Sequence, residues 1–465
     1  MNDTPLSAAE TVEAIAAGRT SPGAVVADSL ARIEARNAEL NAFSVVLADQ
    51  AREQARFLEL GQGEAPGPLY GVPVAIKEEI DVAGCVTTYG GRGNSTPVTE
   101  DGEVVRRLRA AGAIVVGKTH MPEFGAYPYT ESDAHGFTRN PWDSDVQPGG
   151  SSGGTAAAVV SGMVPVGMGG DGGGSIRVPA SYCGLFGLKP QRGRVTTSPM
   201  EHLWWALGVV GPLTRTVLDS AIVYDVIKGS LPSDKWRAGE VGSFTEAARR
   251  EPGRLRIGWC TKPVTKGVRP HPDNVAAVRE TARVLADLGH DVREIKPGYP
   301  DPSLGFVPQF FAGIRTEADA MEHYRRLERR TRETYRLGSW VGPKVIEYAL
   351  EQTEKISLKA NRVFDRVDVL LTPTTANRPP RLGVLEGVGT VRSALRSLPA
   401  IAYAALWNVA GNPACSVPSG IGSDGLPNGC QLVGPTDGEE ILLSLAAQLE
   451  QARPWPLVAP AASRA

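Results

Sequence analysis

Residues 147–179, "QPGGSSGGTAAAVVSGMVPVGMGGDGGGSIRVP", place two glycine- and serine-rich segments around a short Ala/Val run. Glycine loses more conformational freedom on folding than any other residue, so such segments are typical of places where the backbone must approach something closely. Within this stretch, residues 154–161 predict a small helix and "VPVGM" (164–168) predicts a strand. Helix, glycine turn and buried strand in succession are typical of an α/β protein.

The same alternation continues on both sides of the stretch. Ser7 and the pair Ser21-Pro22 predict helix starts, for helices over about 7–17 and 21–36. "YGVPVAIKEEIDV" predicts a strand that ends near Lys77. Further elements are predicted as a helix that ends at Gly112, strands at 113–116, 255–260 and 367–375, a helix that ends at Gly289, and a last helix at 439–452. The chain should therefore form one large α/β unit, with a sheet flanked by helices on both faces.

Charge and cysteine content exclude several classes of function. Lys and Arg total 49 and Asp and Glu total 51, so the net charge is -2 and no basic surface is available for nucleic acid. The five cysteines are scattered singly, which fits neither a disulfide framework nor a zinc site. No run of about 18 apolar residues and no signal peptide is visible. We expect a cytoplasmic protein with no bound metal and no membrane contact.

The second glycine segment allows two interpretations. Residues 167–172 match GxGxxG after a strand, which alone would suggest a dinucleotide site. That fingerprint requires an acidic residue about 20 positions later, to hold a ribose hydroxyl. After Asp171 the next acidic residue is Glu201, and no Gly-Lys-Ser/Thr of a P-loop follows. A nucleotide cofactor is therefore not expected.

The other interpretation is acyl transfer. Gly172 to Gly174 precede Ser175, so successive backbone N–H groups can form a concavity that suits an oxyanion. A nucleophilic serine needs a base, and none of the six histidines is an obvious candidate. A lysine serves as a base when burial disfavours its charged form, and Lys77 at the end of an apolar strand is so placed. Ser151 in the first glycine segment can relay the proton. Taken one by one, these residues are more typical of a helix cap, a solvated lysine and a turn.

Several motifs occur together in one order along the chain. "GGSSGG" is followed 24 residues later by the serine of "GGGSIRVPASYCGLFGLKP", and "GVPVAIKEEIDV" lies upstream. "GAIVVGKTHMPEFG", "TRNPWD" and "GPLTRTVLD" complete a pattern over about 70–215 that resembles the amidase signature family. The resemblance implies a large mixed sheet and hydrolysis of amide bonds by a Ser–Ser–Lys triad, here Ser175, Ser151 and Lys77. It also implies a cis peptide bond before Ser151.

The resemblance further assigns supporting roles by position. It places the oxyanion hole at the backbone N–H groups of Gly172, Gly173, Gly174 and Ser175, and supporting side chains at Ser152, Asp171 and Arg177. The family commonly has threonines where this chain has Gly170 and Gly172, a departure expected to affect selectivity more than activity. Glu78 follows the base, and consecutive strand residues face opposite ways, so its carboxylate is expected to point away from Lys77.

The resemblance covers the whole chain as one amidase domain, residues 1–465. We divide it into N-terminal helices (1–65), a signature core (66–230), a variable substrate-pocket region (231–400) and a C-terminal part of the core (401–465). Substrate contacts are expected at Gly125, Ala126, Tyr127 and Trp205. Aromatic residues in these segments favour an apolar or aryl amide, with esters and carbamates as further substrates. No cofactor is implied, and a homodimer is the common arrangement.

Two other functions stay open. The first is the glutaminase-type component of a tRNA-dependent amidotransferase, which has the same fold and acts within a complex. The second is an inert binding or scaffold protein, against which the complete Lys77, Ser151 and Ser175 set argues. Release of amine from simple amides by the single chain would distinguish the leading interpretation from both.

Overall fold

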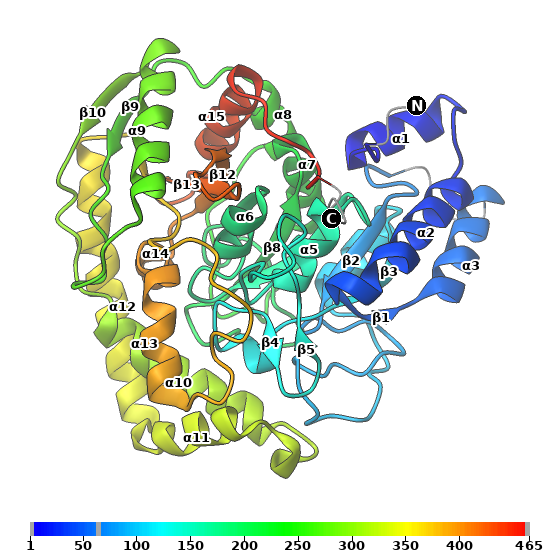
Figure 1. Cartoon of the computed structure of the whole chain (residues 1–465), viewed down its shortest axis with the longest axis horizontal. Helices are drawn as coiled ribbons and strands as arrows, with labels where there is room; N and C mark the ends of the chain where they lie inside the picture. Colours follow the sequence, from blue (N-terminus) through cyan, green and yellow to red (C-terminus); the bar gives the residue numbers. More distant parts are fainter. Residues whose placement is uncertain (1–3, 62–66, 461–465) are drawn as a thin grey trace.

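A mixed sheet of 11 strands forms the centre of the computed structural model, which describes residues 4–61 and 67–460 (Figure 1). The strand order is β1-β3-β2-β6-β8-β7-β12-β13-β11-β9-β10. Strand β2 is parallel to β3 and β6, and β9 is parallel to β10 and β11, whereas the other pairings are antiparallel. Helices cover the sheet, which confirms the predicted α/β class.

The strands are short and mostly buried. They are β1 (Phe43–Val46), β2 (Pro73–Lys77), β3 (Ile114–Thr119), β6 (Val166–Asp171), β7 (Phe186–Lys189), β8 (Val209–Thr214), β9 (Arg256–Trp259), β10 (Asp291–Glu294), β11 (Val369–Pro373), β12 (Ala414–Ile421) and β13 (Pro427–Val433). A separate two-stranded ribbon pairs β4 (Glu131–Ser132) with β5 (Gly136–Phe137).

The helices fall into a sheet-covering set and a separate lobe. The first set comprises α1 (Ala8–Ala16), α2 (Pro22–Leu40), α3 (Ala48–Glu59), α4 (Glu103–Ala110), α5 (Gly153–Val160), α6 (Arg177–Cys183), α7 (Val217–Ile227), α8 (Phe244–Arg249), α9 (Pro272–Asp287) and α15 (Glu439–Ala452). The lobe comprises α10 (Ser303–Asp319), α11 (Arg329–Leu337), α12 (Pro343–Asn361), α13 (Thr390–Ile401) and α14 (Ala405–Ala410).

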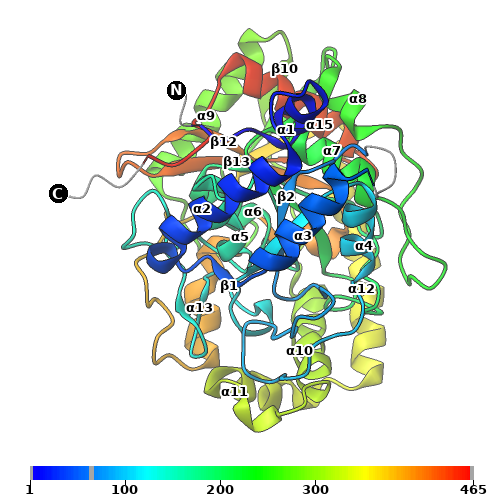
Figure 2. The ribbon, with the colours of Figure 1, turned by 90° about the vertical axis from the view of Figure 1, so that its right-hand side faces the viewer.

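The two ends of the sheet are covered by different parts of the chain. Helices α2 and α3 pack together near β1 and β3, as Figure 2 shows from the side. Helix α9 packs on β11 and β13 towards the opposite end (Figure 1). Helices α10 to α13 lie together at the lower left of Figure 1. Strands from all four predicted segments join the one sheet.

The predicted helix starts follow from capping. Ser7 accepts a hydrogen bond from the Glu10 N–H at 3.2 Å, while the Glu10 side chain bonds back to the Ser7 N–H in a capping box. Ser21 caps α2 by accepting from the Ala24 N–H at 3.3 Å. Helix α2 continues to Leu40, beyond the predicted end at 36, and stops where Asn41 adopts a left-handed φ of 51°.

Strand β6 is longer than predicted and includes residues expected to form a loop. It runs from Val166 to Asp171, paired with β2 on one side and β8 on the other. Its glycines permit close packing of helix α5: a Cβ at Gly169 would lie 2.7 Å from Ser152 Oγ, and one at Gly167 would overlap the Thr155 methyl group. The segment that matches GxGxxG is therefore mainly a central strand.

Between residues 4 and 61 and between 67 and 460, the structure contains no helix with the length and apolar character needed to span a lipid bilayer.

Candidate active site

The expected base lies at the end of a central strand. Lys77 is the last residue of β2, and Asp171 is the last residue of the neighbouring parallel strand β6. The carboxyl ends of parallel strands meet at one edge of a sheet, where α/β proteins commonly bind ligands. There Lys77 Nζ donates a hydrogen bond to Ser151 Oγ at 2.8 Å, with both side chains buried.

Ser151 and Ser175 are brought together through backbone contacts. The Gly150–Ser151 peptide bond is cis, as the family resemblance implied. The Ser152 N–H donates to the Ser175 carbonyl at 3.2 Å, which ties the two glycine segments to each other. The Ser152 hydroxyl lies 3.3 Å from both the N and O atoms of Gly170, so it links α5 to β6. Lys77, Ser151 and Ser175 thus lie in one connected site.

The expected oxyanion donors differ in availability. The Gly174 N–H donates to Asp171 Oδ1 at 2.7 Å, so it is already engaged and does not serve as a free donor here. This corrects the expectation for Gly174. Gly173 and Ser175 line the cavity described below. A preorganised donor must point to where negative charge develops, so Gly173 and Ser175 are the better placed donors.

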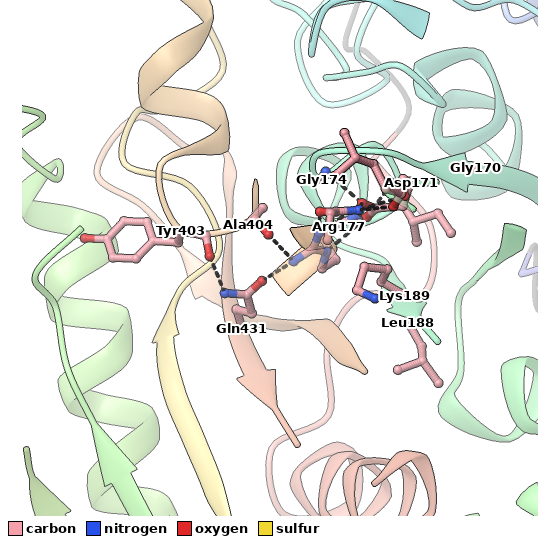
Figure 3. A network of polar contacts seen from close by, with 12 residues as sticks. Gly170, Asp171, Gly174, Arg177, Leu188, Lys189, Tyr403, Ala404 and Gln431 are labelled. Atoms are coloured by element: carbon pink, nitrogen blue, oxygen red, sulfur yellow. Dashed lines mark hydrogen bonds and ion pairs between the residues drawn. The ribbon is translucent and has the colours of Figure 1, made fainter. Parts of the chain in front are cut away.

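Asp171 and Arg177 form the buried polar network of Figure 3, which braces the glycine loop. Arg177 donates to Asp171 Oδ1 at 2.9 Å and to Asp171 Oδ2 at 3.0 Å. It also donates to Gln431 Oε1 at 2.7 Å and to the Ala404 carbonyl at 3.1 Å. The network therefore joins β6 and α6 to β13 and the segment before α14.

Asp171 stays ionised in this interior position. Burial alone would raise the pKa of the Asp171 carboxyl, but the Arg177 guanidinium and hydrogen bonds from Arg177 and Asn408 hold it below its usual range. Because both oxygens of a charged carboxylate accept hydrogen bonds from the loop, Asp171 fixes the backbone that carries Ser175.

A carboxylate that the sequence analysis missed lies against the base. Glu79 Oε1 is 2.9 Å from Lys77 Nζ, and both side chains are almost fully buried. Glu78, considered from the sequence, faces away as expected and accepts from the hydroxyl of Thr88 at 2.6 Å. A side chain at Gly170 would overlap Glu79 Oε1, so the glycine that replaces the family's threonine makes room for Glu79. The same i, i+2 alternation that directs Glu78 away from Lys77 brings Glu79 to it.

A cavity of about 590 Å³ opens beside Ser175. Its walls are largely apolar, and its aromatic lining residues are Tyr127, Trp204, Tyr299, Phe306, Phe310 and Phe311. Helices α10 and α13 supply much of this wall, from the region expected to be variable. A concave, mostly apolar pocket with a few polar groups is typical of a small-molecule site.

Three of the four expected substrate contacts line this cavity. Gly125, Ala126 and Tyr127 do so, and a Cβ at Gly125 would lie 3.0 Å from Ser151 Oγ. Trp205 is not among the lining residues, because it stacks on His202 with a ring distance of 4.5 Å. Its neighbour Trp204 lines the cavity instead. The sequence indicated an aromatic pair here but gave no means of choosing the member that faces the cavity.

Nothing in the described ranges gathers three or more His, Cys, Asp or Glu side chains in an arrangement that could hold a metal ion.

Comparison with known proteins places this geometry in a family. The sequence model of the family described as Amidase matches residues 24–443. A protein of Mycobacterium tuberculosis named "Putative amidase AmiB2" is 46% identical over 430 residues, which cover 92% of this chain and 91% of that protein. The 6-aminohexanoate-cyclic-dimer hydrolase of Paenarthrobacter ureafaciens is 33% identical and covers 95% of this chain and 94% of its own length.

A third relative has the name that corresponds to the alternative function. It is the glutaminase-type component of the glutamyl-tRNA(Gln) amidotransferase from a Synechococcus strain, and it is 36% identical over 91% of this chain and 92% of that protein.

Solved structures agree with the sequence comparison. The structure of a 6-aminohexanoate cyclic dimer hydrolase superposes with a TM-score of 0.92 at 32% identity, over 98% of both chains. A bacterial aryl acylamidase of the amidase signature family superposes with a TM-score of 0.87 at 29% identity, over 97% of both chains. With its mixed sheet, its Lys77–Ser151 contact and this extent of similarity, the chain belongs to the amidase signature family.

Proposed function

We propose that this protein hydrolyses carboxylic amides with an apolar or aryl acyl group, to a carboxylate and an amine, through an acyl-serine intermediate on Ser175. The single observation that carries the proposal is the buried hydrogen bond from Lys77 Nζ to Ser151 Oγ at 2.8 Å, beside a cavity that contains Ser175. A lysine paired to a serine hydroxyl at the edge of an aromatic-lined cavity suits nucleophilic acyl transfer.

In the proposed cycle, neutral Lys77 accepts the proton of the Ser151 hydroxyl. Ser151 in turn accepts the proton of Ser175 as Ser175 Oγ attacks the amide carbonyl. The N–H groups of Gly173 and Ser175 stabilise the oxyanion. The C–N bond then breaks, and the proton returns along the same chain to the departing amine, which could not leave as an anion. Water attacks the acyl-serine with Lys77 and Ser151 again in the base role, and the carboxylate is released.

The character of the cavity supports the substrate class. Its wall is mainly aromatic and aliphatic, and Val178 follows Arg177, so no second arginine stands there to hold a substrate carboxylate. The resemblance to an aryl acylamidase structure supports the same class. Esters and aryl carbamates have better leaving groups than amides, so we expect them to react as well. We further propose that the protein acts as a cytoplasmic enzyme without a metal or cofactor, and as a homodimer.

The test is amine release from four compounds: an aryl acetanilide, an aliphatic amide, an aryl carbamate and glutamine. Wild type is measured beside Ser175→Ala and Lys77→Ala, with circular dichroism to check that both variants are folded. Anilide or carbamate turnover that is lost in both variants supports the proposal. Turnover that persists in Ser175→Ala would exclude the acyl-serine mechanism. Activity on glutamine alone would favour the glutaminase-type component of an amidotransferase.

A further inference from the structure

Trp204 forms the part of the cavity wall that lies beside the glycine loop. Trp204 and Trp205 are neighbours in sequence, but only Trp204 lines the cavity next to Ser175 and Gly173. The Trp204 side chain is buried, and its backbone has a left-handed φ of 50°. An aromatic residue rarely adopts this conformation without a strong local reason, so the contacts of the indole need an explanation.

The glycine loop is shaped to accept the indole. A Cβ at Gly172 would lie 2.8 Å from Trp204 Cε3 and 3.1 Å from Trp204 Cζ3. Real Cβ atoms are not found this close to an aromatic ring, so any side chain at position 172 would displace Trp204. Gly172 does not have a positive φ, hence its backbone conformation does not require glycine. The contact with Trp204 is the structural reason for glycine at this position.

Helix α10 holds the other side of the ring. A Cβ at Gly313 would lie 2.6 Å from Trp204 Cδ1, and Phe310 packs edge-on against the indole with ring centres 5.3 Å apart. Trp204 Nε1 donates a hydrogen bond to Glu317 Oε1 at 2.9 Å. Burial raises the pKa of the Glu317 carboxyl well above its usual range, so Glu317 is uncharged at neutral pH and still accepts this bond.

We propose that Trp204 is the specificity-determining residue of this site, and that Glu317 is its positioning residue. The inference rests on the proposed amide hydrolysis and adds to it what limits the substrate. The indole is fixed on one side by Gly172 and on the other by Gly313, so it cannot move aside for a larger substrate. The size of the acyl group accepted beside Gly173 is therefore set by Trp204.

The experiment compares two series of anilides. In one series the acyl group grows from acetyl to hexanoyl and benzoyl on a constant aniline, and in the other the amine grows on a constant acetyl group. For Trp204→Ala we expect the ratio of kcat/KM for the largest acyl group to that for acetyl to rise about tenfold or more, mostly through KM. Trp204→Phe keeps an aromatic ring in the wall and should give an intermediate ratio, so it tests the inference if the alanine variant does not fold.

Trp205 offers the matched control. It is the same residue type, one position along the chain, and it stacks on His202 outside the cavity. Trp205→Ala should leave both selectivity ratios within about twofold of wild type, because a residue outside the pocket does not contact the transition state. An equal change of selectivity in Trp204→Ala and Trp205→Ala would overturn the inference.

Glu317 is tested by conservative replacement. Glu317→Gln retains an oxygen acceptor for Trp204 Nε1, so it should keep the wild-type selectivity ratio, whereas Glu317→Ala should move the ratio towards that of Trp204→Ala. Loss of selectivity in Glu317→Gln to the same extent as in Glu317→Ala would exclude the positioning role.

The two proposals fail in different ways. A wild-type protein that cleaves none of the anilides, nor the esters and carbamates of the functional test, would contradict the proposed function and with it this inference. A wild type that is active, but whose acyl and amine selectivity both stay unchanged in Trp204→Ala and Trp204→Phe, would overturn the inference alone. A change confined to the amine series would assign Trp204 to the leaving-group side and overturn the acyl-size limit.

Discussion

Lys77 Nζ lies 2.9 Å from Glu79 Oε1, so the proposed base has a carboxylate as its direct neighbour in the protein interior. Glu79 Oε1 makes no hydrogen bond to another described residue, which leaves Lys77 as its partner. Three further titratable groups surround the pair: Asp81 and Tyr89 from the segment after β2, and Glu317 from α10. Burial raises the pKa of both Tyr89 and Glu317, so these two stay uncharged at neutral pH.

Glu79→Gln should make the enzyme more active on the acidic side. A carboxylate beside a lysine favours the ammonium form, whereas catalysis needs the neutral amine, so removal of the negative charge favours the catalytic form. The acidic limb of kcat/KM should move to lower pH by about 1 to 3 units. The measurement is the pH profile of anilide hydrolysis for wild type and variant.

Glu78→Gln is the control for that profile, because it removes the same charge from a buried neighbouring position that bonds to Thr88 instead. Its acidic limb should stay where the wild-type limb lies. A Glu79→Gln limb that is unchanged, or moved to higher pH, would contradict this account of Lys77.

Asp171→Asn should destabilise the folded chain. It removes one partner of a fully buried pair and leaves the Arg177 guanidinium without its counter-charge, which costs about 3 to 5 kcal/mol. The melting temperature at pH 7 should fall clearly. Asp145→Asn is the matched control, because the Asp145–Arg381 pair is exposed at 3.7 Å and should matter by less than about 1 kcal/mol.

The Asp171 contribution should also depend on pH. Its pKa is lower in the folded state than in the unfolded chain, so the stabilisation is complete above the unfolded value of about 4. It is lost as the pH falls from there towards the folded value. Wild type and Asp171→Asn should therefore converge in melting temperature in acid, and a constant difference from pH 7 to pH 3 would count against the linkage.

Glu328→Gln should alter stability in the opposite pH direction. Burial and the nearby Glu123 raise the pKa of Glu328 to about 8, above the unfolded value of about 4.3. Between these values the folded state keeps a proton that the unfolded chain has lost, so wild-type stability should decrease as the pH rises from 5 to 8. The variant has no such proton, and its melting temperature should fall less over this range. Parallel curves for the two proteins would show that Glu328 does not contribute.

Gly167→Ala should be destabilising, and Thr155→Ser should relieve it. A Cβ at Gly167 would overlap the methyl group of Thr155 across the α5–β6 contact, and overpacking of this kind costs about 1 to 3 kcal/mol. Serine at position 155 lacks that methyl group but keeps the hydroxyl that bonds to the Met168 carbonyl at 3.2 Å. The double variant should melt closer to Thr155→Ser than Gly167→Ala does to wild type. Additive losses would exclude this contact as the cause.

Much of the fold could be predicted from local patterns. The last helix, predicted at 439–452, forms α15 with the same bounds, because the apolar spacing of these residues is strongly helical. Ser7 and Ser21 mark helix starts through their capping chemistry. The glycines of β6 are less informative, because glycine in a strand looks like a loop until the neighbouring helix α5 is known.

The site residues show a similar limit. Lys77, Ser151 and Ser175 stand in recognisable motifs, but the approach of Glu79 to Lys77 depends on side-chain direction and on the space left by Gly170. Arg194 reads as a surface charge by composition, yet it is buried and pairs with Glu439 at 2.9 Å, about 245 positions later. Contacts between such distant positions are set by the sheet order, which no single segment of sequence records.

The cavity beside Ser175 has a consequence for how such a protein could diversify. Its reactive groups come from residues 73–175, whereas most of its aromatic wall comes from residues 299–311 and its aliphatic wall from residues 394–405. Chemistry and recognition are therefore encoded in separate stretches of one gene. Exchange or gradual rewriting of the later stretch could redirect the enzyme to new compounds while the bond-breaking apparatus is inherited intact.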